Sequence, residues 1–264
     1  MQSTINTKMS LVSSGLPAIP ARERFYIAYS GILLAVVLVG FSRTYYLRTI
    51  FTVPPMPSGA LLHGAVLTGW FIGAMLQPFW VATRRINVHR IAGWLLTVLS
   101  VGLVWTSAKL ILAGAADMGR RAPLMLARGI PPDQIREVAA TAFWSAGAAA
   151  ITFTVLFIWA LIQRRSPQTH KRLMLIASVS IIQPALVRIF RDWTAFGEFI
   201  NGNSLMFAVS VALVLIIPLF IHDWRTRRSI HRATWMGSLI YCSIKLFGIL
   251  YLAKTTVGQA VIDM

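Results

Sequence analysis

Seven long apolar runs, separated by short polar or Pro-rich segments, limit what this chain can fold into. A helix rises 1.5 Å per residue, so about 20 apolar residues cross the roughly 30 Å hydrocarbon core of a bilayer. Helices satisfy their own backbone hydrogen bonds in lipid, and these runs lack the alternation of barrel strands. We therefore expect membrane spans at 25–42, 60–82, 92–113, 138–162, 172–190, 203–222 and 235–253.

The composition supports a membrane setting. Charged residues make up 12% of the 264-residue chain and hydrophobic residues 56%, whereas soluble domains carry about 25% charged residues. The predicted fold class is an all-α polytopic membrane protein, a seven-transmembrane-helix bundle without a soluble domain. We expect an N-terminal tail over 1–24, the membrane domain over 25–253 and a C-terminal tail over 254–264. The link 116–137 should be partly ordered, with a short interfacial helix at 121–128.

The distribution of charge predicts the orientation. The chain carries 25 Lys and Arg against 8 Asp and Glu, a formal net charge of +17. The basic links 83–90, 163–172 and 223–232 each follow an even-numbered span, so they share one side with the N-terminal tail. The positive-inside rule places that side in the cytoplasm, with the C-terminus outside a bacterial inner membrane. Because the cations lie between apolar runs, they favour lipid headgroups over nucleic acid as partners.

A polar stripe runs along the second predicted span. His63, Trp70, Gln77 and Arg84 recur every seven residues, and seven residues are close to two helical turns, so the four should share one face. Polar groups are costly against lipid, and we expect this face to point into the bundle. The stripe fits a ligand site, and it equally fits interhelical hydrogen bonds that only hold helices together.

Cationic side chains gather at the predicted outer ends of three spans. Arg43 ends the first span, His63 begins the second and Arg188 ends the fifth, with Asp192 four residues further on and able to pair with it. If these ends meet, they form a cationic pocket beneath the Pro-rich segment 53–59, suited to an anionic headgroup, a carboxylate or a quinone oxygen. The alternative is that the arginines extend to lipid headgroups. The predicted pocket residues are Arg43, His63, Trp70, Gln77, Arg188 and Asp192.

Two histidines share a local pattern at the predicted inner side. His89 precedes Arg90, and His170 precedes Lys171 and Arg172. Neutral imidazoles from two helices can ligate a heme iron, and neighbouring cations can bind its propionates. His89 and His170 are therefore candidate ligands of one b-type heme, with Arg90 and Arg172 beside it. Contact of the same residues with lipid phosphate is the alternative.

Several motifs between about residues 41 and 191 resemble a group of bacterial multi-pass membrane proteins with an HG…W…Q…HR..G core. The resemblance implies an integral inner-membrane protein and brings no established activity with it. More distantly, helix-borne histidines are similar to those of membrane-bound di-heme cytochromes b, but the outer side here offers only His63. The matching motifs are FSRTYYL (41–47), His63–Gly64, Trp70, Gln77, HRIAGW (89–94) and HKRLMLIA (170–177).

Three functions remain open. The spans contain no paired carboxylates, H-E-x-x-H or G-x-S-x-G, which disfavours a hydrolase, and Lys245 has no carboxylate on the third span to act as the counter-ion of a retinal Schiff base. The favoured hypothesis is a redox-linked protein with a quinone-like partner, an oxidoreductase if it is an enzyme. The alternatives are a binding or transport protein for an anionic amphiphile, and a subunit of a membrane complex or homo-oligomer that docks through Gly69, Gly73 and the small residues 145–150.

Overall fold

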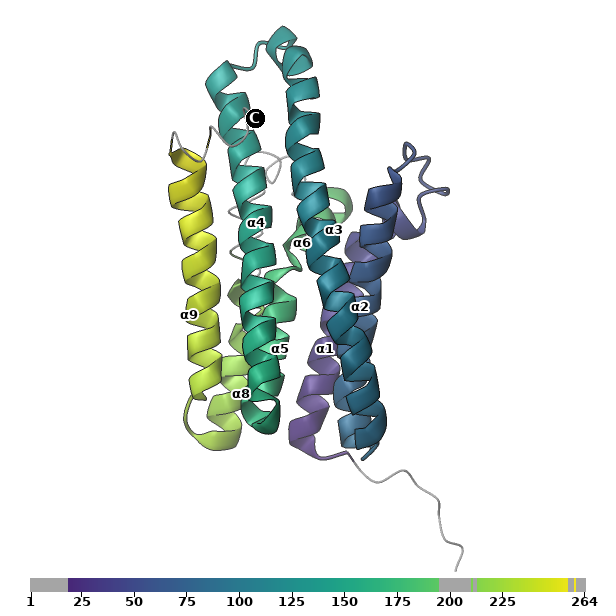
Figure 1. Ribbon diagram of the computed structural model, residues 1–264, viewed down its shortest axis with the longest axis vertical. Coiled ribbons are helices and arrows are strands. Elements are labelled where there is room, and N and C mark those ends of the chain that lie inside the picture. The colour runs from purple at the N-terminus through teal and green to yellow at the C-terminus, as the bar shows by residue number, and fades with distance from the viewer. Residues whose placement is uncertain (1–18, 195–209, 211–212, 256–258, 260–264) are drawn as a thin grey trace, which may run out of the picture.

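The computed structural model describes residues 19–194, 210, 213–255 and 259, and the regular structure in them is helical. Long helices lie side by side along the length of the molecule (Figure 1). Short π-helices follow α1 and α9, at Ser42–Tyr46 and Phe247–Tyr251, and 3-10 turns occur at Gln163–Arg165 and Leu252–Lys254. The α-helices are α1 (Ala21–Gly40), α2 (Ser58–Ala82), α3 (Ile86–Ala127), α4 (Pro132–Ile162), α5 (Pro167–Ser180), α6 (Gln183–Trp193), α8 (Ile217–Arg227) and α9 (Arg232–Leu246).

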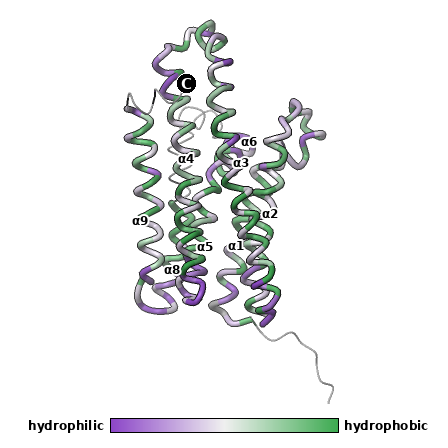
Figure 2. Tube along the Cα trace, viewed as in Figure 1, coloured by the Kyte–Doolittle hydropathy of each residue, from purple (hydrophilic) through white to green (hydrophobic). Residues whose placement is uncertain are grey.

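The prediction of an all-helical multi-pass membrane protein is confirmed. Among the described residues, five helices are long and apolar enough to cross a bilayer, and the bent pair of α5 and α6 makes six. Figure 2 shows apolar helix bodies, with polar residues gathered at the loops that join α2 to α3, α4 to α5 and α8 to α9. The first half of the sixth predicted span, 203–222, lies mostly outside the described residues, so a count of seven stays a prediction.

The α3–α4 hairpin differs from expectation. The region predicted to be a partly ordered link with one short helix is mostly helical, because α3 continues to Ala127 and α4 begins at Pro132. Asp117 pairs with Arg121 one turn later at 2.6 Å, which stabilises the extension. Pro132 starts α4 at a position that needs no backbone N–H. The 42 residues of α3 span about 63 Å, so the hairpin projects beyond its neighbours (Figure 1).

The predicted fifth span, 172–190, is broken into two helices. α5 ends at Ser180, α6 begins at Gln183, and their axes differ by 48°. Pro184 supplies the cause, because it lacks an N–H and its ring collides with the carbonyl four residues earlier in a continuous helix. The break brings the polar side chain of Gln183 into the bundle, where it is buried.

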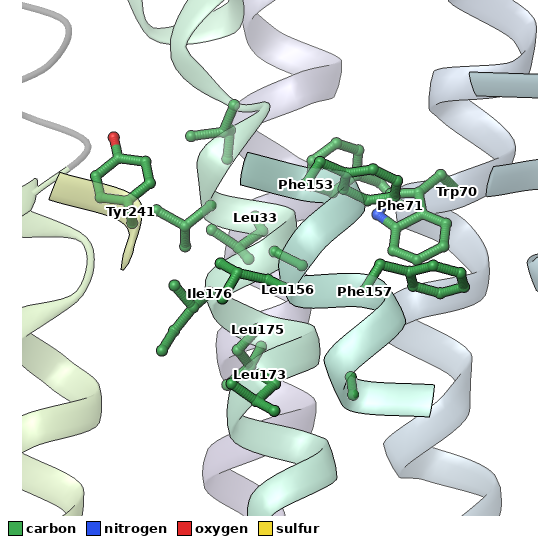
Figure 3. Close-up of a cluster of buried hydrophobic side chains, with 14 of the residues drawn as sticks. Leu33, Trp70, Phe71, Phe153, Leu156, Phe157, Leu173, Leu175, Ile176 and Tyr241 are labelled. Atoms are coloured by element: carbon green, nitrogen blue, oxygen red, sulfur yellow. The ribbon is translucent and has the colours of Figure 1, made fainter. Parts of the chain in front are cut away.

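The core lies where α1, α2, α4 and α5 meet. Trp70 is fully buried and packs edge-on against Phe153 and Phe157, whose rings stack (Figure 3). Gly69 and Gly73 face Leu99 and Leu96 of α3. The two glycines thus allow close packing within the chain, on the face that the sequence suggested for a partner.

Candidate functional site

Three members of the polar stripe point into the bundle as expected. His63 and Gln77 hydrogen-bond α3 and Trp70 hydrogen-bonds α5, so the stripe links helices at three levels. Arg84 is an exception: α2 ends at Ala82, and Arg84 lies in the next loop, exposed, with φ of 60°. The expectation that it continues the helical stripe is wrong, because the helix stops first. The partners are Thr106 Oγ1 for His63 Nδ1 (3.0 Å), Ser178 Oγ for Trp70 Nε1 (3.3 Å) and His89 for the Gln77 amide.

A cavity of about 400 Å³ lies between α1, α2, α3, α4 and the α5–α6 break. This volume and a lining of mostly apolar side chains are typical of small-molecule sites. Leu67, Leu103 and the alanine-rich face of α4 form much of the wall, and Met56 from the Pro-rich segment also contributes. The polar lining residues are Thr44, Tyr45, Tyr46, His63, Thr68, Ser107 and Arg188.

The π-helix Ser42–Tyr46 builds one wall of this cavity. The Tyr46 hydroxyl bonds Thr68 Oγ1 at 2.6 Å, and the Tyr45 hydroxyl donates to Leu61 O at 2.9 Å. Gly64 lies against the Tyr45 ring, where any Cβ would overlap the ring. The π-turn and the small residue opposite it therefore fix Thr44 beside the cavity, in a kind of local distortion that is frequent at functional sites.

Two buried polar atoms at the cavity lack a partner. Among the described residues, four buried side-chain polar atoms have none, and two of these are Arg188 Nε and Thr44 Oγ1, both from cavity-lining residues. Arg188 is held by donation from Nη1 to Pro184 O (3.0 Å) and by the Phe41 ring, 4.6 Å from its Cζ. A buried unmade hydrogen bond costs about 1–3 kcal/mol. The cavity therefore offers fixed donors that an oxygen acceptor can satisfy.

His63 adds a hydrogen-bond acceptor to the donors of Arg188 and Thr44. The Thr106 hydroxyl donates to Gly102 O at 2.8 Å, so its oxygen accepts from His63 Nδ1, and the proton of the neutral ring lies on Nδ1. Nε2 is then left as an acceptor. The lining can thus donate to one oxygen of a headgroup and accept a hydroxyl proton from another.

Arg43 lies outside the cavity lining, unlike its predicted partners His63 and Arg188. It donates to Asp192 O at 2.8 Å and lies over the rings of Phe51 and Trp193. Arg43 therefore ties the first loop to the end of α6. Asp192 pairs with Arg191 at 2.7 Å, and not with Arg188 as its spacing suggested, which leaves Arg188 without a direct ion pair among the described residues.

The two candidate heme ligands, His89 and His170, interact electrostatically in the structure. His170 Nδ1 donates to Ala160 O at 2.8 Å, because a carbonyl only accepts, and its Nε2 keeps a lone pair. Gln77, oriented so that its oxygen accepts from Gly93 N at 3.1 Å, donates to His89 Nδ1. The His89 proton then lies on Nε2. Only His170 has the tautomer that a metal ligand requires.

Of the two cations expected beside such a heme, Arg90 is exposed on α3 and Arg172 is buried. Arg172 is 1% exposed, and it donates through Nε to Asp223 at 2.9 Å and through Nη1 to Gln168 at 2.8 Å. Asp223 also accepts from Thr234 and from the backbone N–H of His231. Arg172 therefore joins α5, α8 and α9, and a propionate would have to compete with Asp223.

The electrostatics of this inner network follow from its geometry. Burial raises the pKa of Asp223, but the hydrogen bonds from Arg172 and Thr234 and the Arg172 charge outweigh it and hold that pKa below its usual value. Burial, with the charges of Arg172 and Arg227, lowers the pKa of His231. Neutral His231 caps α9 by accepting from Ala233 N at 3.0 Å.

Sequence reasoning missed two of these groups. Thr44 carried no signal, since a threonine at a span end is ordinary. Gln183 did carry one, because Gln before Pro inside an apolar run marks a buried polar group at a helix break, and its amide oxygen accepts from Lys245 Nζ at 2.7 Å. No family model, curated protein or solved structure matches the chain.

Proposed function

We propose that the protein binds a membrane-soluble amphiphile with an oxygen-bearing headgroup, in the cavity enclosed by α1 to α4 and the α5–α6 break. One observation carries the proposal: Arg188 Nε and Thr44 Oγ1 are buried without partners among the described residues, and both residues line an apolar cavity of about 400 Å³. A carboxylate or quinone oxygen would accept from both groups. The apolar part of the ligand would pack on Leu67, Leu103 and the small residues of α4.

The position of Arg188 differs from that of an arginine that extends to the lipid headgroups. A snorkelling side chain extends to the aqueous headgroup layer. Arg188 instead lies over Phe41 and bonds a carbonyl of its own helix. In our proposal the cavity opens toward the outer leaflet of a bacterial inner membrane, with the basic loops of Figure 2 in the cytoplasm.

The test is ligand-induced stabilisation of the purified protein in nanodiscs, with decanoate and a short-chain quinone as probes. A ligand at 100 times its Kd stabilises the folded state by about 2.7 kcal/mol, a readily measured rise in Tm. Arg188→Gln should abolish the rise for the probe that binds. Arg191→Gln is the matched control, since it removes the same charge from an exposed site on the same helix. Equal loss in both variants, or no rise in the wild type, would refute the proposal.

A redox function with one b-type heme is the second candidate. The electrostatic interaction between His89 and His170, and the free Nε2 of His170, favour it. The Gln77 bond to His89 and the Asp223 bond to Arg172 must rearrange for it to hold. Protein from heme-replete cells should then show a Soret band that is lost in His170→Ala. A spectrum without the band would end this candidate and leave the cavity proposal intact.

A further inference from the structure

A buried lysine lies on the far side of the α5–α6 break. Lys245 of α9 is 1% exposed, and its Nζ donates to Ser145 O at 3.1 Å and to Gln183 Oε1 at 2.7 Å. Gln183 Nε2 in turn donates to Ser145 Oγ at 3.2 Å. Neutral oxygen acceptors therefore surround the amine in place of a carboxylate. An ionisable side chain in such a position within a membrane protein usually has a function.

The elements packed against α9 bring no acid to this position among the described residues. Tyr241 and Cys242, one turn earlier on α9, are the ionisable groups beside Lys245 along its own helix. On α4, Arg136 and Glu137 are more than two turns before Ser145. The charged residues of α5 lie at its opposite end, and on α6 the first charged residue is Arg188.

The hydrogen bonds fit one protonation state of the amine better than the other. A neutral amine has two N–H bonds, and the two acceptors satisfy both. An ammonium has a third N–H and a full charge, which in a low-dielectric interior needs an anion nearby. Because the described residues supply none, a bound anion is a fitting partner for a protonated Lys245.

A second, smaller cavity of about 180 Å³ adjoins this cluster. Both partners of Lys245, Ser145 and Gln183, line it, so an anion there would lie one side chain from Nζ. Its volume is below the roughly 300–1,000 Å³ usual for whole ligands, and it suits a headgroup alone. Four residues, Ala142, Ala146, Ala149 and Pro184, line both cavities, so the two cavities adjoin along these side chains.

We propose that the smaller cavity is a proton-linked carboxylate site, in which the headgroup binds against Gln183 while Lys245 takes up one proton. The inference rests on the proposed function, because the headgroup reaches this site from the larger cavity. The step balances: a neutral amine, a proton released by the aqueous buffer and a carboxylate give an ammonium–carboxylate pair and the deprotonated buffer. Uptake of a monocarboxylic amphiphile would then carry a proton with it, and the ligand class narrows from oxygen-bearing headgroups to carboxylates.

The experiment is calorimetric titration of decanoate into the full chain in phosphatidylcholine nanodiscs near neutral pH. It is run in two buffers with different protonation enthalpies, and empty nanodiscs are subtracted. The difference in binding enthalpy gives the protons taken up per ligand, and we expect about one in the wild type. Lys245→Met should bring this number close to zero. Lys109→Met, which removes an exposed lysine on α3, should leave it unchanged.

Two further variants make the result decisive. His63→Gln tests the other group that can take up a proton, and it should weaken binding while about one proton is still taken up. Gln183→Glu places a carboxylate beside Lys245, so the amine is already protonated, and proton uptake should disappear even if Lys245→Met fails to fold.

The failures are distinguishable. Absence of decanoate binding in the wild type overturns the proposed function and, with it, this site. Binding without proton uptake, uptake that persists in Lys245→Met or Gln183→Glu, or uptake lost in His63→Gln overturns the proton-linked site alone.

Discussion

Asp223→Asn keeps the shape of a side chain that holds three helices together and removes only its charge. Arg172 and Asp223 are 1% and 0% exposed, and the guanidinium donates to the carboxylate through Nε at 2.9 Å. In the variant, Arg172 stays buried with only neutral oxygens as partners, those of Gln168 and of the new amide. Leaving one charge of a buried pair uncompensated costs about 3–5 kcal/mol. We expect a loss of this size in the free energy of unfolding, measured by steric trapping in bicelles.

Two controls separate charge from packing. The double variant Arg172→Met/Asp223→Leu removes both charges and should recover most of the loss, because apolar replacements of a buried pair are often neutral or stabilising. Asp117→Asn breaks an exposed pair with Arg121 and should cost less than about 1 kcal/mol. A loss below about 1 kcal/mol in Asp223→Asn, or a double variant as unstable as the single one, would refute the reasoning.

The same contact gives a pH dependence with a defined sign. The pKa of Asp223 in the fold is below its ordinary 3.8. Its stabilisation is therefore fully present above the unfolded value and is lost as pH falls through the folded one. Wild-type stability should decline in this acid range more steeply than that of Asp223→Asn, as acid titrations of Tm can show.

Two further predictions concern a glycine and a capping histidine. Gly40→Ala should destabilise by about 1–3 kcal/mol, since its Cβ would overlap the Ala185 backbone, whereas Gly31→Ala, with open space around it, should be neutral or stabilising; equal thermal unfolding of the two variants would contradict this. The lowered pKa of His231 means that its cap on Ala233 is present above the ordinary 6.5 and is lost as pH falls through the folded value. His231→Asn keeps a capping acceptor and should flatten the pH profile of Tm, and an unchanged profile would contradict the assignment.

The helical membrane fold follows from the sequence because hydropathy over 20 residues is a local property. The ends of the elements are less predictable. Pro184 interrupts the helix of the predicted fifth span, yet Pro78 and Pro123 lie inside α2 and α3. Tertiary packing therefore decides whether a proline ends a helix. Hydropathy marks where a helix leaves lipid, and α3 continues well past that point, because its polar extension is stabilised by ion pairs and not by burial.

The site was predictable to the extent that it depends on span ends. His63 and Arg188 lie at the outer ends of predicted spans, and the structure places both in the lining of the cavity. The role of Arg43 was not predictable, since its backbone acceptor in Asp192 depends on how α6 follows the break. The pairing of Gln77 with His89 likewise joins two helices at a depth that no sequence periodicity specifies.

Photo-crosslinking with a diazirine-labelled decanoate, mapped by mass spectrometry, tests the central claim of an internal amphiphile site most directly. The account predicts labels on cavity-lining residues such as Leu67, Leu103 and Ala146, and loss of these labels when unlabelled decanoate is in excess. Labels confined to lipid-facing residues such as Trp94 and Val98, which are 70% and 72% exposed, would contradict it.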